Sequence, residues 1–255
     1  MFSLKGRVAV ITGASSGLGR QMAKGFALAG ANLVIIARRL ERLEELKLEL
    51  EKEGVKVLPI KCDVTSSEEI KNAAKVSKEV FGKIDILVNN AGVQYQQDYL
   101  DCISDEQFDR TMKVNIYGMF YLTREALPHM KPGSSIINLS SVTTFFGEPQ
   151  LIDYVTTKGA IVGFTRSLAR NLALKNIRVN AVAPGYFWTA LQPACWEAEK
   201  IPTEQKTKSA VEERKERERK EREAKRNHDY AVEFAGKELV PEIRGCGDPK
   251  KLKEY

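Results

Sequence analysis

Residues 12–19 read TGASSGLG, and this stretch decides the fold. An apolar, β-branched run, VAVIT at residues 8–12, leads directly into it, and a helical pattern follows. A glycine-rich loop between a buried strand and a helix lets backbone N–H groups approach a pyrophosphate, and the helix N-terminus adds partial positive charge. The spacing GxxxGxG on its own would also suit a tight turn with positive φ at glycine. The context predicts a dinucleotide site that contains Gly13, Ser15, Ser16, Gly17, Leu18 and Gly19.

Short β-branched runs alternate with longer helical patterns along the first two-thirds of the chain. This alternation is typical of a parallel sheet with helices on both faces. We expect strands at residues 7–12, 32–37, 56–61, 84–89, 135–140 and 178–183. We expect helices at residues 17–29, 40–53, 67–81, 105–129 and 153–174. Right-handed crossovers predict a doubly wound, Rossmann-like α/β sheet with strand order 3-2-1-4-5-6, and a seventh strand is doubtful.

The composition limits the class of protein. Of the 255 residues 43% are hydrophobic and 29% charged, which is typical of a soluble globular chain. The net charge is +6, but Lys and Arg are interleaved with Glu, so we expect a mixed-sign surface and no nucleic-acid partner. There is no signal peptide and no apolar run of about 18 residues, and we expect no membrane association. Four distant cysteines without a CxxC pair indicate a reducing cytoplasm, and His129 and His228 fit no metal-ligand spacing.

The second expected strand ends at Ala37, and Arg38 and Arg39 follow it. Folds that bind NAD usually carry an acid here for the ribose 2′-hydroxyl, whereas an arginine accommodates the 2′-phosphate of NADP. We therefore expect NADP(H) as the preferred cofactor, with NAD(H) possible. Arg38 is the favoured phosphate ligand because its planar guanidinium matches phosphate bidentately. Arg39 is a second candidate, and the alternative for both is a solvated position at the start of the next helix.

Three side chains suggest hydride-transfer chemistry. Ser141 follows an apolar strand, at the sheet edge where open α/β folds bind ligands. Tyr154 and Lys158 are four residues apart on the next helix, so they share one face. A phenol has an ordinary pKa near 10, and a nearby ammonium lowers it, so that Tyr154 can exchange a proton with a carbonyl oxygen near neutral pH. Ser141 would hydrogen-bond the same oxygen.

The glycine-rich loop, then CDV at residues 62–64, NNAG at 89–92 and Ser141 followed by YVTTK at 154–158 resemble the short-chain dehydrogenase/reductase family in order and spacing. The resemblance implies that Asp63 and Val64 hold the adenine, and that Asn90, Ala91 and Gly92 end the fourth strand against the cofactor. It implies that Asn115 completes a proton relay with Ser141, Tyr154 and Lys158, of which Tyr154 and Lys158 also contact the cofactor. In PGxxxT, formed by Pro184, Gly185 and Thr189, the threonine hydroxyl would bind the nicotinamide carboxamide.

The substrate is less well defined by the sequence. FSLKGRVAVITGAS at residues 2–15 and PGYF at 184–187 look most like gluconate 5-dehydrogenases, which suggests NADP(H)-dependent interconversion of a carbonyl and a secondary alcohol, such as 5-keto-gluconate and gluconate. Reductases of 3-oxoacyl carrier-protein thioesters share nearly all these motifs and are the alternative. A catalytically idle nucleotide-binding or interaction protein is a third interpretation.

The pattern changes near Leu191, after which strand-like runs almost vanish and residues 211–226, VEERKERERKEREAKR, are nearly all charged. We therefore divide the chain into a dinucleotide-binding and catalytic domain, residues 1–190, and an atypical charged helical tail, residues 191–255. The tail would be an exposed helix or an interaction segment, and it would arise from a shifted reading frame or from divergence. We expect a homo-oligomer, a dimer or tetramer, if this C-terminal region folds.

Overall fold

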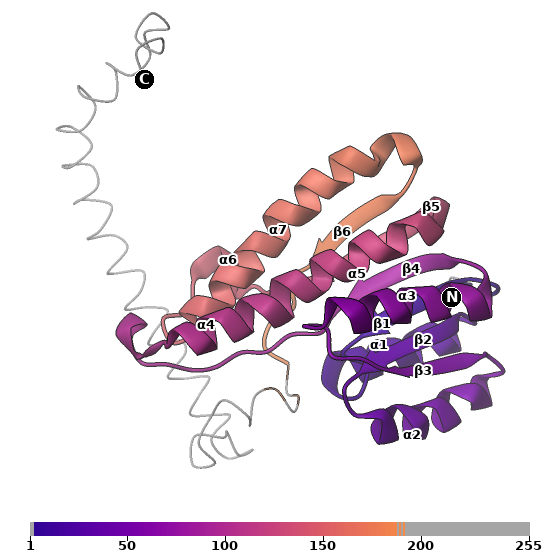
Figure 1. Cartoon of the computed structure of the whole chain (residues 1–255), viewed down its shortest axis with the longest axis horizontal. Coiled ribbons are helices and arrows are strands. Elements are labelled where there is room, and N and C mark those ends of the chain that lie inside the picture. Colours follow the sequence, from indigo (N-terminus) through magenta and orange to yellow (C-terminus); the bar gives the residue numbers. More distant parts are fainter. Residues whose placement is uncertain (1–2, 188, 190, 192–255) are drawn as a thin grey trace, which may run out of the picture. The chain divides into compact units, whose positions relative to one another are not determined.

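The computed structural model describes residues 3–187, 189 and 191 (Figure 1). The expected tail, apart from its first residue, lies outside this part of the chain, and so does the boundary that would set it apart as a domain. His228 and the charged stretch at 211–226 lie outside it too.

Within the described residues, one parallel sheet has the order β3-β2-β1-β4-β5-β6, which confirms the predicted topology. The strands are β1 Val8–Thr12, β2 Asn32–Ala37, β3 Val57–Lys61, β4 Ile84–Asn89, β5 Met130–Leu139 and β6 Arg178–Val182. All six strands run in the same direction, but the order in which the chain adds them to the sheet reverses between β1 and β4: β2 and β3 lie on one side of β1, and β4, β5 and β6 on the other. At such a switch point the carboxyl ends of neighbouring strands leave a crevice for a ligand.

Helices cover the two faces of the sheet. Successive residues of a strand point to opposite faces, so Ile11 packs with α1 and α2 while Val10 packs on the side of α3, α5 and α7. The helices are α1 Gly17–Leu28, α2 Leu40–Leu50, α3 Ser67–Phe81, α5 Gly118–Ala126 and α7 Ile152–Leu172. β1 and β4 are buried along their whole length, which explains their continuous apolar runs.

The helix expected at 105–129 is divided into four segments. These are α4 Asp105–Met112, the π-helix η3 Lys113–Tyr117, α5, and the 3-10 turn η4 Leu127–His129. α4, η3 and α5 follow one another as a long rod beside α7 (Figure 1). Hydrophobic periodicity does not distinguish an α-helix from a π-helical turn inside it, so this change could not be predicted from the sequence.

Other boundaries also differ from expectation. β5 begins at Met130 rather than at residue 135, through a register irregularity against β4. The predicted ends of the second and fifth helices are the 3-10 turns η1 Glu51–Glu53 and η5 Ala173–Lys175. The short helices η2 Leu100–Cys102 and α6 Thr143–Phe146 were not predicted, because three or four residues carry no measurable periodicity.

Candidate active site

The glycine-rich loop lies between β1 and α1 and is fastened to the end of β4. Asn90 donates from Nδ2 to the carbonyl of Thr12, 2.8 Å away, and the hydroxyl of Thr12 accepts the N–H groups of Asn90 and Ala91 at 3.0 Å each. Gly13 has a φ of +66°, and a Cβ at Gly19 would collide with the carbonyl of Gly13. The loop is therefore tight and backbone-lined, as contact with a pyrophosphate requires.

The two arginines after β2 differ in position. Arg39 reaches back across the loop, where its Nη2 donates to the hydroxyls of Ser15 at 3.3 Å and Ser16 at 3.5 Å. Arg38 instead contributes positive potential at Asp63. The sequence favoured Arg38 as the phosphate ligand and kept Arg39 as a second candidate; of the two, Arg39 is the one that hydrogen-bonds the loop.

Asp63 follows β3 at the same edge of the sheet. Partial burial raises the pKa of its carboxyl, but hydrogen bonds from the N–H and hydroxyl of Thr65, together with the positive charges of Arg110 and Arg38, outweigh this and lower it. Val64 is buried, and a Cβ at Gly118 would collide with it, so α5 packs closely here. An ionised Asp63 near an arginine gives this edge both signs of charge.

The PGxxxT segment returns to the glycine-rich loop. The carbonyl of Pro184 accepts the N–H of Val142 at 3.1 Å, and Gly185 continues the segment. Thr189 lies close to Gly17: a Cβ added to Gly17 would be 3.3 Å from the Cβ of Thr189. Leu18 follows Gly17 in the first turn of α1. The structure thus brings together the loop and the threonine that the resemblance assigns to one cofactor.

Ser141 lies just beyond β5, and its hydroxyl is oriented by Thr143. The Ser141 Oγ accepts the Thr143 hydroxyl at 2.9 Å and the Thr143 N–H at 3.2 Å. Both acceptor positions of this oxygen are used, so the Ser141 proton is directed elsewhere and can be donated. Sequence reasoning missed Thr143; the only signal was a second hydroxyl residue two positions after the serine.

Tyr154 and Lys158 are buried near the start of α7. The Lys158 Nζ lies 5.4 Å from the centroid of the Tyr154 ring and donates to the carbonyl of Leu139 at 2.7 Å. Burial lowers the pKa of the Lys158 ammonium to about 8, because removal from water disfavours the charged form. A Cβ on Gly92 would be 3.6 Å from this nitrogen, so the NNAG segment borders it directly.

Asn115 lies in the π-helix, and its side-chain amide is fully occupied. Its Oδ1 accepts the N–H of Val93 at 2.8 Å, and its Nδ2 donates to the carbonyl of Val93 and to the hydroxyl of Thr157, both at 3.0 Å. Asn115 therefore joins the loop after β4 to α7, the helix that carries Tyr154.

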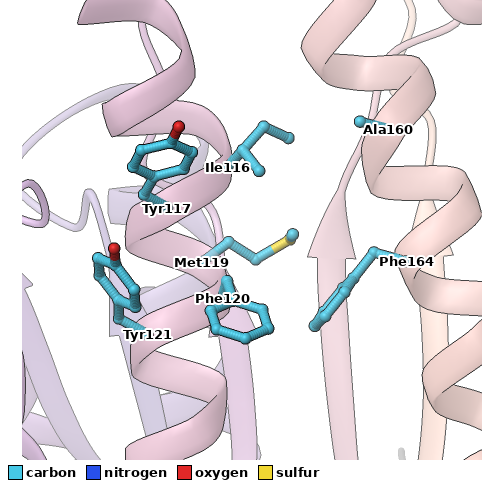
Figure 2. Close-up of a pocket in the computed structure, with 7 residues that line it drawn as sticks. All are labelled: Ile116, Tyr117, Met119, Phe120, Tyr121, Ala160 and Phe164. Atoms are coloured by element: carbon cyan, nitrogen blue, oxygen red, sulfur yellow. The ribbon is translucent and has the colours of Figure 1, made fainter. Parts of the chain in front are cut away.

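A separate hollow of about 350 Å³ opens between the aromatic side chains of α5 and α7. Phe120 and Phe164 meet there edge to face, with ring centroids 6.1 Å apart, and Figure 2 shows them pointing toward each other from the two helices. Tyr117 and Phe120 are well exposed, so this surface is apolar. The hollow contains none of the predicted site residues.

Residues 3–187, 189 and 191 contain neither a metal-ligand cluster nor a membrane-spanning helix. No three His, Cys, Asp or Glu side chains of this part come together as a metal site would require. None of its helices combines the length and apolar character that a membrane span needs.

A family model described as short chain dehydrogenase matches residues 7–200. The uncharacterized oxidoreductase YhdF of Bacillus subtilis strain 168 is 49% identical over 199 residues, which cover 78% of this chain and 69% of the relative. The NADPH-dependent aldehyde reductase 1, chloroplastic, of Arabidopsis thaliana is 43% identical over 208 residues, 78% of this chain and 71% of the relative. The glucose and ribitol dehydrogenase of Daucus carota is 38% identical over 205 residues, 78% of this chain and 70% of the relative.

Solved structures show the same relationship. The crystal structure of 3-ketoacyl-(acyl-carrier-protein) reductase from Brucella melitensis, complexed with NADH, superposes with a TM-score of 0.71 at 35% identity. The match covers 76% of this chain and 81% of that one.

Proposed function

The chain belongs to the short-chain dehydrogenase family of NAD(P)(H)-dependent oxidoreductases, and we propose that it reduces the carbonyl of a small polyhydroxylated substrate with NADP(H). The observation that carries the proposal is the position of the Lys158 Nζ, which lies 5.4 Å from the centroid of the Tyr154 ring and borders the NNAG segment at Gly92. The same nitrogen donates to the carbonyl of Leu139, two residues before Ser141. A 5-keto sugar acid such as 5-keto-gluconate is the substrate we would test first.

In this proposal each side chain has one task. NADPH, when bound, would supply the hydride to the carbonyl carbon. Tyr154 donates its phenolic proton to the carbonyl oxygen, and Lys158 favours the phenolate that remains because its ammonium is close to the ring. Ser141 donates a hydrogen bond to the same oxygen, with its hydroxyl oriented by Thr143. Asn115 keeps the loop after β4 against α7.

The cofactor would lie along the carboxyl edge of β1, β2 and β4. The tight, backbone-lined turn at Gly13 and Gly19 fits a pyrophosphate, since a side chain at Gly19 would have no room. The proposed ligands are the residues Gly13, Ser15, Ser16, Gly17, Leu18, Gly19, Arg38, Arg39, Asp63, Val64, Asn90, Ala91, Gly92, Tyr154, Lys158, Pro184, Gly185 and Thr189.

A preference for NADP(H) is supported by the Arg39 guanidinium beside Ser15 and Ser16, since a planar guanidinium suits the 2′-phosphate. We expect Arg39→Ala to weaken NADPH binding about tenfold or more and to leave NADH binding within about twofold, as loss of one charge-assisted contact predicts. Arg42→Ala, on the exposed side of α2, is the matched control. Equal weakening of both cofactors would contradict the preference.

The substrate class is supported by two relatives, one named an NADPH-dependent aldehyde reductase and one a glucose and ribitol dehydrogenase. A second candidate, reduction of a 3-oxoacyl thioester, is supported by the structural match to a 3-ketoacyl-(acyl-carrier-protein) reductase. The test is NADPH consumption with 5-keto-gluconate and with an acetoacetyl thioester. We expect faster turnover of the keto acid, and its loss in Tyr154→Phe with NADPH binding retained.

Binding of NADPH without turnover of either compound would overturn the proposed reaction. That result would favour a nucleotide-binding protein without catalysis.

We also propose that the protein works as a homo-oligomer. The exposed aromatic side chains Tyr117 and Phe120, around the hollow between α5 and α7, support this, because a contiguous apolar patch on a folded domain is typical of an interface. Light scattering of the full chain should give a multiple of 28.6 kDa, and Phe120→Glu should reduce it. A monomeric mass for the unaltered chain would reject the proposal.

A further inference from the structure

Two side-chain hydrogen bonds, which we call rungs, join α4 and η3 to the start of α7. In the first, the Thr111 hydroxyl donates to the Asp153 Oδ2 at 2.8 Å. In the second, the Asn115 amide donates to the Thr157 hydroxyl at 3.0 Å. The partners of the second rung follow those of the first by four residues on both helices, so the rungs stack one helical turn apart. All four side chains are almost completely buried.

Tyr154 lies in sequence between the α7 members of the two rungs, and both polar groups of its backbone are bound by them. Its N–H donates to the Asp153 Oδ1 at 2.7 Å, and its carbonyl accepts the Thr157 hydroxyl at 2.7 Å. Asp153 and Thr157, which bond α7 to α4 and η3, thus also bind the backbone of Tyr154.

The first rung continues into the loops around the site. Gln107 donates to the Asp153 Oδ2 at 3.1 Å and accepts the Gln97 amide at 2.6 Å. The N–H of Gln97 donates to the carbonyl of Gln150, just before α7. Asp153 is therefore where the loop after β4, α4 and the first turn of α7 are joined.

Asp153 also takes the place of a side-chain cap at the start of α7. Leu151 precedes the helix and makes no side-chain cap. Asp153 lies in the first turn, where a carboxylate satisfies a free N–H and opposes the positive end of the helix dipole. This buried carboxylate accepts three hydrogen bonds, from the Thr111 hydroxyl, the Gln107 amide and the Tyr154 N–H, and these replace its contacts with water.

We propose that Asp153 and Thr111 are positioning residues for Tyr154, which fix where its phenol stands relative to Ser141 and Lys158. The inference rests on the proposed function in one respect, which is that Tyr154 acts as the proton donor. The placement of the ring is a structural property of the chain in either case. Misplacement of a reacting group by about 1 Å can lower a rate about 100-fold.

Matched threonine substitutions test this. Thr111→Val removes the hydroxyl of the first rung, while Thr165→Val removes a comparable buried hydroxyl farther along α7, which accepts the Asn138 amide at 3.0 Å. Asp153→Asn keeps the shape of the rung and changes its hydrogen bonding. We expect Thr111→Val and Asp153→Asn to lower kcat about 10- to 100-fold, with KM and the Kd for NADPH within about threefold. Thr165→Val should keep kcat within about twofold.

An NMR measurement that needs no turnover separates the positioning role of Asp153 and Thr111 from the proposed reaction. In the full chain labelled at the tyrosine ring carbons, the NMR resonance of Tyr154 is the one absent from Tyr154→Phe. It should move or broaden in Thr111→Val and Asp153→Asn and stay unchanged in Thr165→Val. If the unaltered chain turns over no carbonyl, this pattern alone supports the positioning role. An unchanged resonance, an unchanged kcat, or an equal kcat loss in Thr165→Val would overturn it.

Discussion

Replacing Lys158 with methionine is expected to stabilise the folded chain at neutral pH, although it removes a residue proposed to act in catalysis. The lysine is buried, and removal from water lowers the pKa of its ammonium from the ordinary 10.5 to about 8. At pH 7 the group is charged in both the folded and the unfolded chain, so folding must carry the charge into a poorly solvated place. Methionine has a similar length without that charge.

The size of the effect follows from the pKa. Each tenfold change in an ionisation constant corresponds to about 1.4 kcal/mol, so burying the charged Lys158 costs about 3 kcal/mol at pH 7. The substitution also leaves the carbonyl of Leu139 without the Lys158 donor, a loss of about 1–3 kcal/mol. The net expected gain at pH 7 is about 1 kcal/mol.

The pH dependence is the sharper test. Between about pH 8 and 10.5 the unfolded chain holds the Lys158 proton more often than the folded chain does, so the stability of the unaltered protein rises with pH in this window. From pH 7 to pH 9.5 it should gain about 2 kcal/mol relative to Lys158→Met. The assay is the free energy of unfolding in urea at both pH values. Lys71→Met, on the exposed side of α3, is the control. An equal difference at both pH values would show that burial does not penalise the charge of Lys158.

Three shorter predictions concern other parts of the site and sheet. Gly19→Ala is expected to lose about 1–3 kcal/mol of stability and most NADPH binding, because its Cβ would collide with the Gly13 carbonyl. The control Gly25→Ala, on the same helix, has open space and should gain about 0.5–1 kcal/mol. Urea denaturation measures both changes in stability. Thr143→Ala should lower kcat roughly fivefold to tenfold without changing the Kd for NADPH, since one neutral hydrogen bond to Ser141 is lost; an unchanged kcat would count against the orientation of that hydroxyl.

Burial raises the pKa of Asp85, but bonds from Lys83, the Val8 N–H and Arg7 outweigh this and lower it, so its stabilisation is present above the unfolded pKa and lost as pH falls through the folded pKa. Asp85→Asn should therefore lose about 1–3 kcal/mol at pH 7 and much less once the pH is below the lowered folded-state pKa of Asp85, and a loss that does not depend on pH would refute the ionic account.

The fold could be predicted from the sequence because the central strands of this parallel sheet are covered on both faces and are therefore largely apolar. Runs such as Asn32–Ala37 and Ile84–Asn89 are therefore visible without knowledge of what packs on them. The glycine-rich loop and the Tyr154 and Lys158 pair could be found because local spacing decides their geometry. The π-helix at Lys113–Tyr117 and the short helix Thr143–Phe146 could not, since hydrophobic periodicity does not distinguish a single π-helical turn and four residues carry no measurable periodicity.

The directions of individual side chains could not be predicted from the sequence either. Arg38 and Arg39 are chemically equal and adjacent, and only the path of the backbone into α2 turns Arg39 toward Ser15 and Ser16. Asp153 and Thr111 are 42 residues apart and belong to no recognisable motif. Their partnership becomes visible only when α4 and α7 lie side by side.

The two parts of the sheet also differ in how they are stabilised. Of the buried polar side chains in the described residues, only Thr12, Ser15 and Ser77 precede Asp85. Apolar side chains form the core around α1 and α2, whereas amides and hydroxyls link β4, β5 and α7, as where Asn138 joins Asn89 to Thr165. Hydrophobic burial is non-directional and suffices for a scaffold under the cofactor. Directional hydrogen bonds specify geometry, and they are concentrated where Tyr154 and Lys158 must be held.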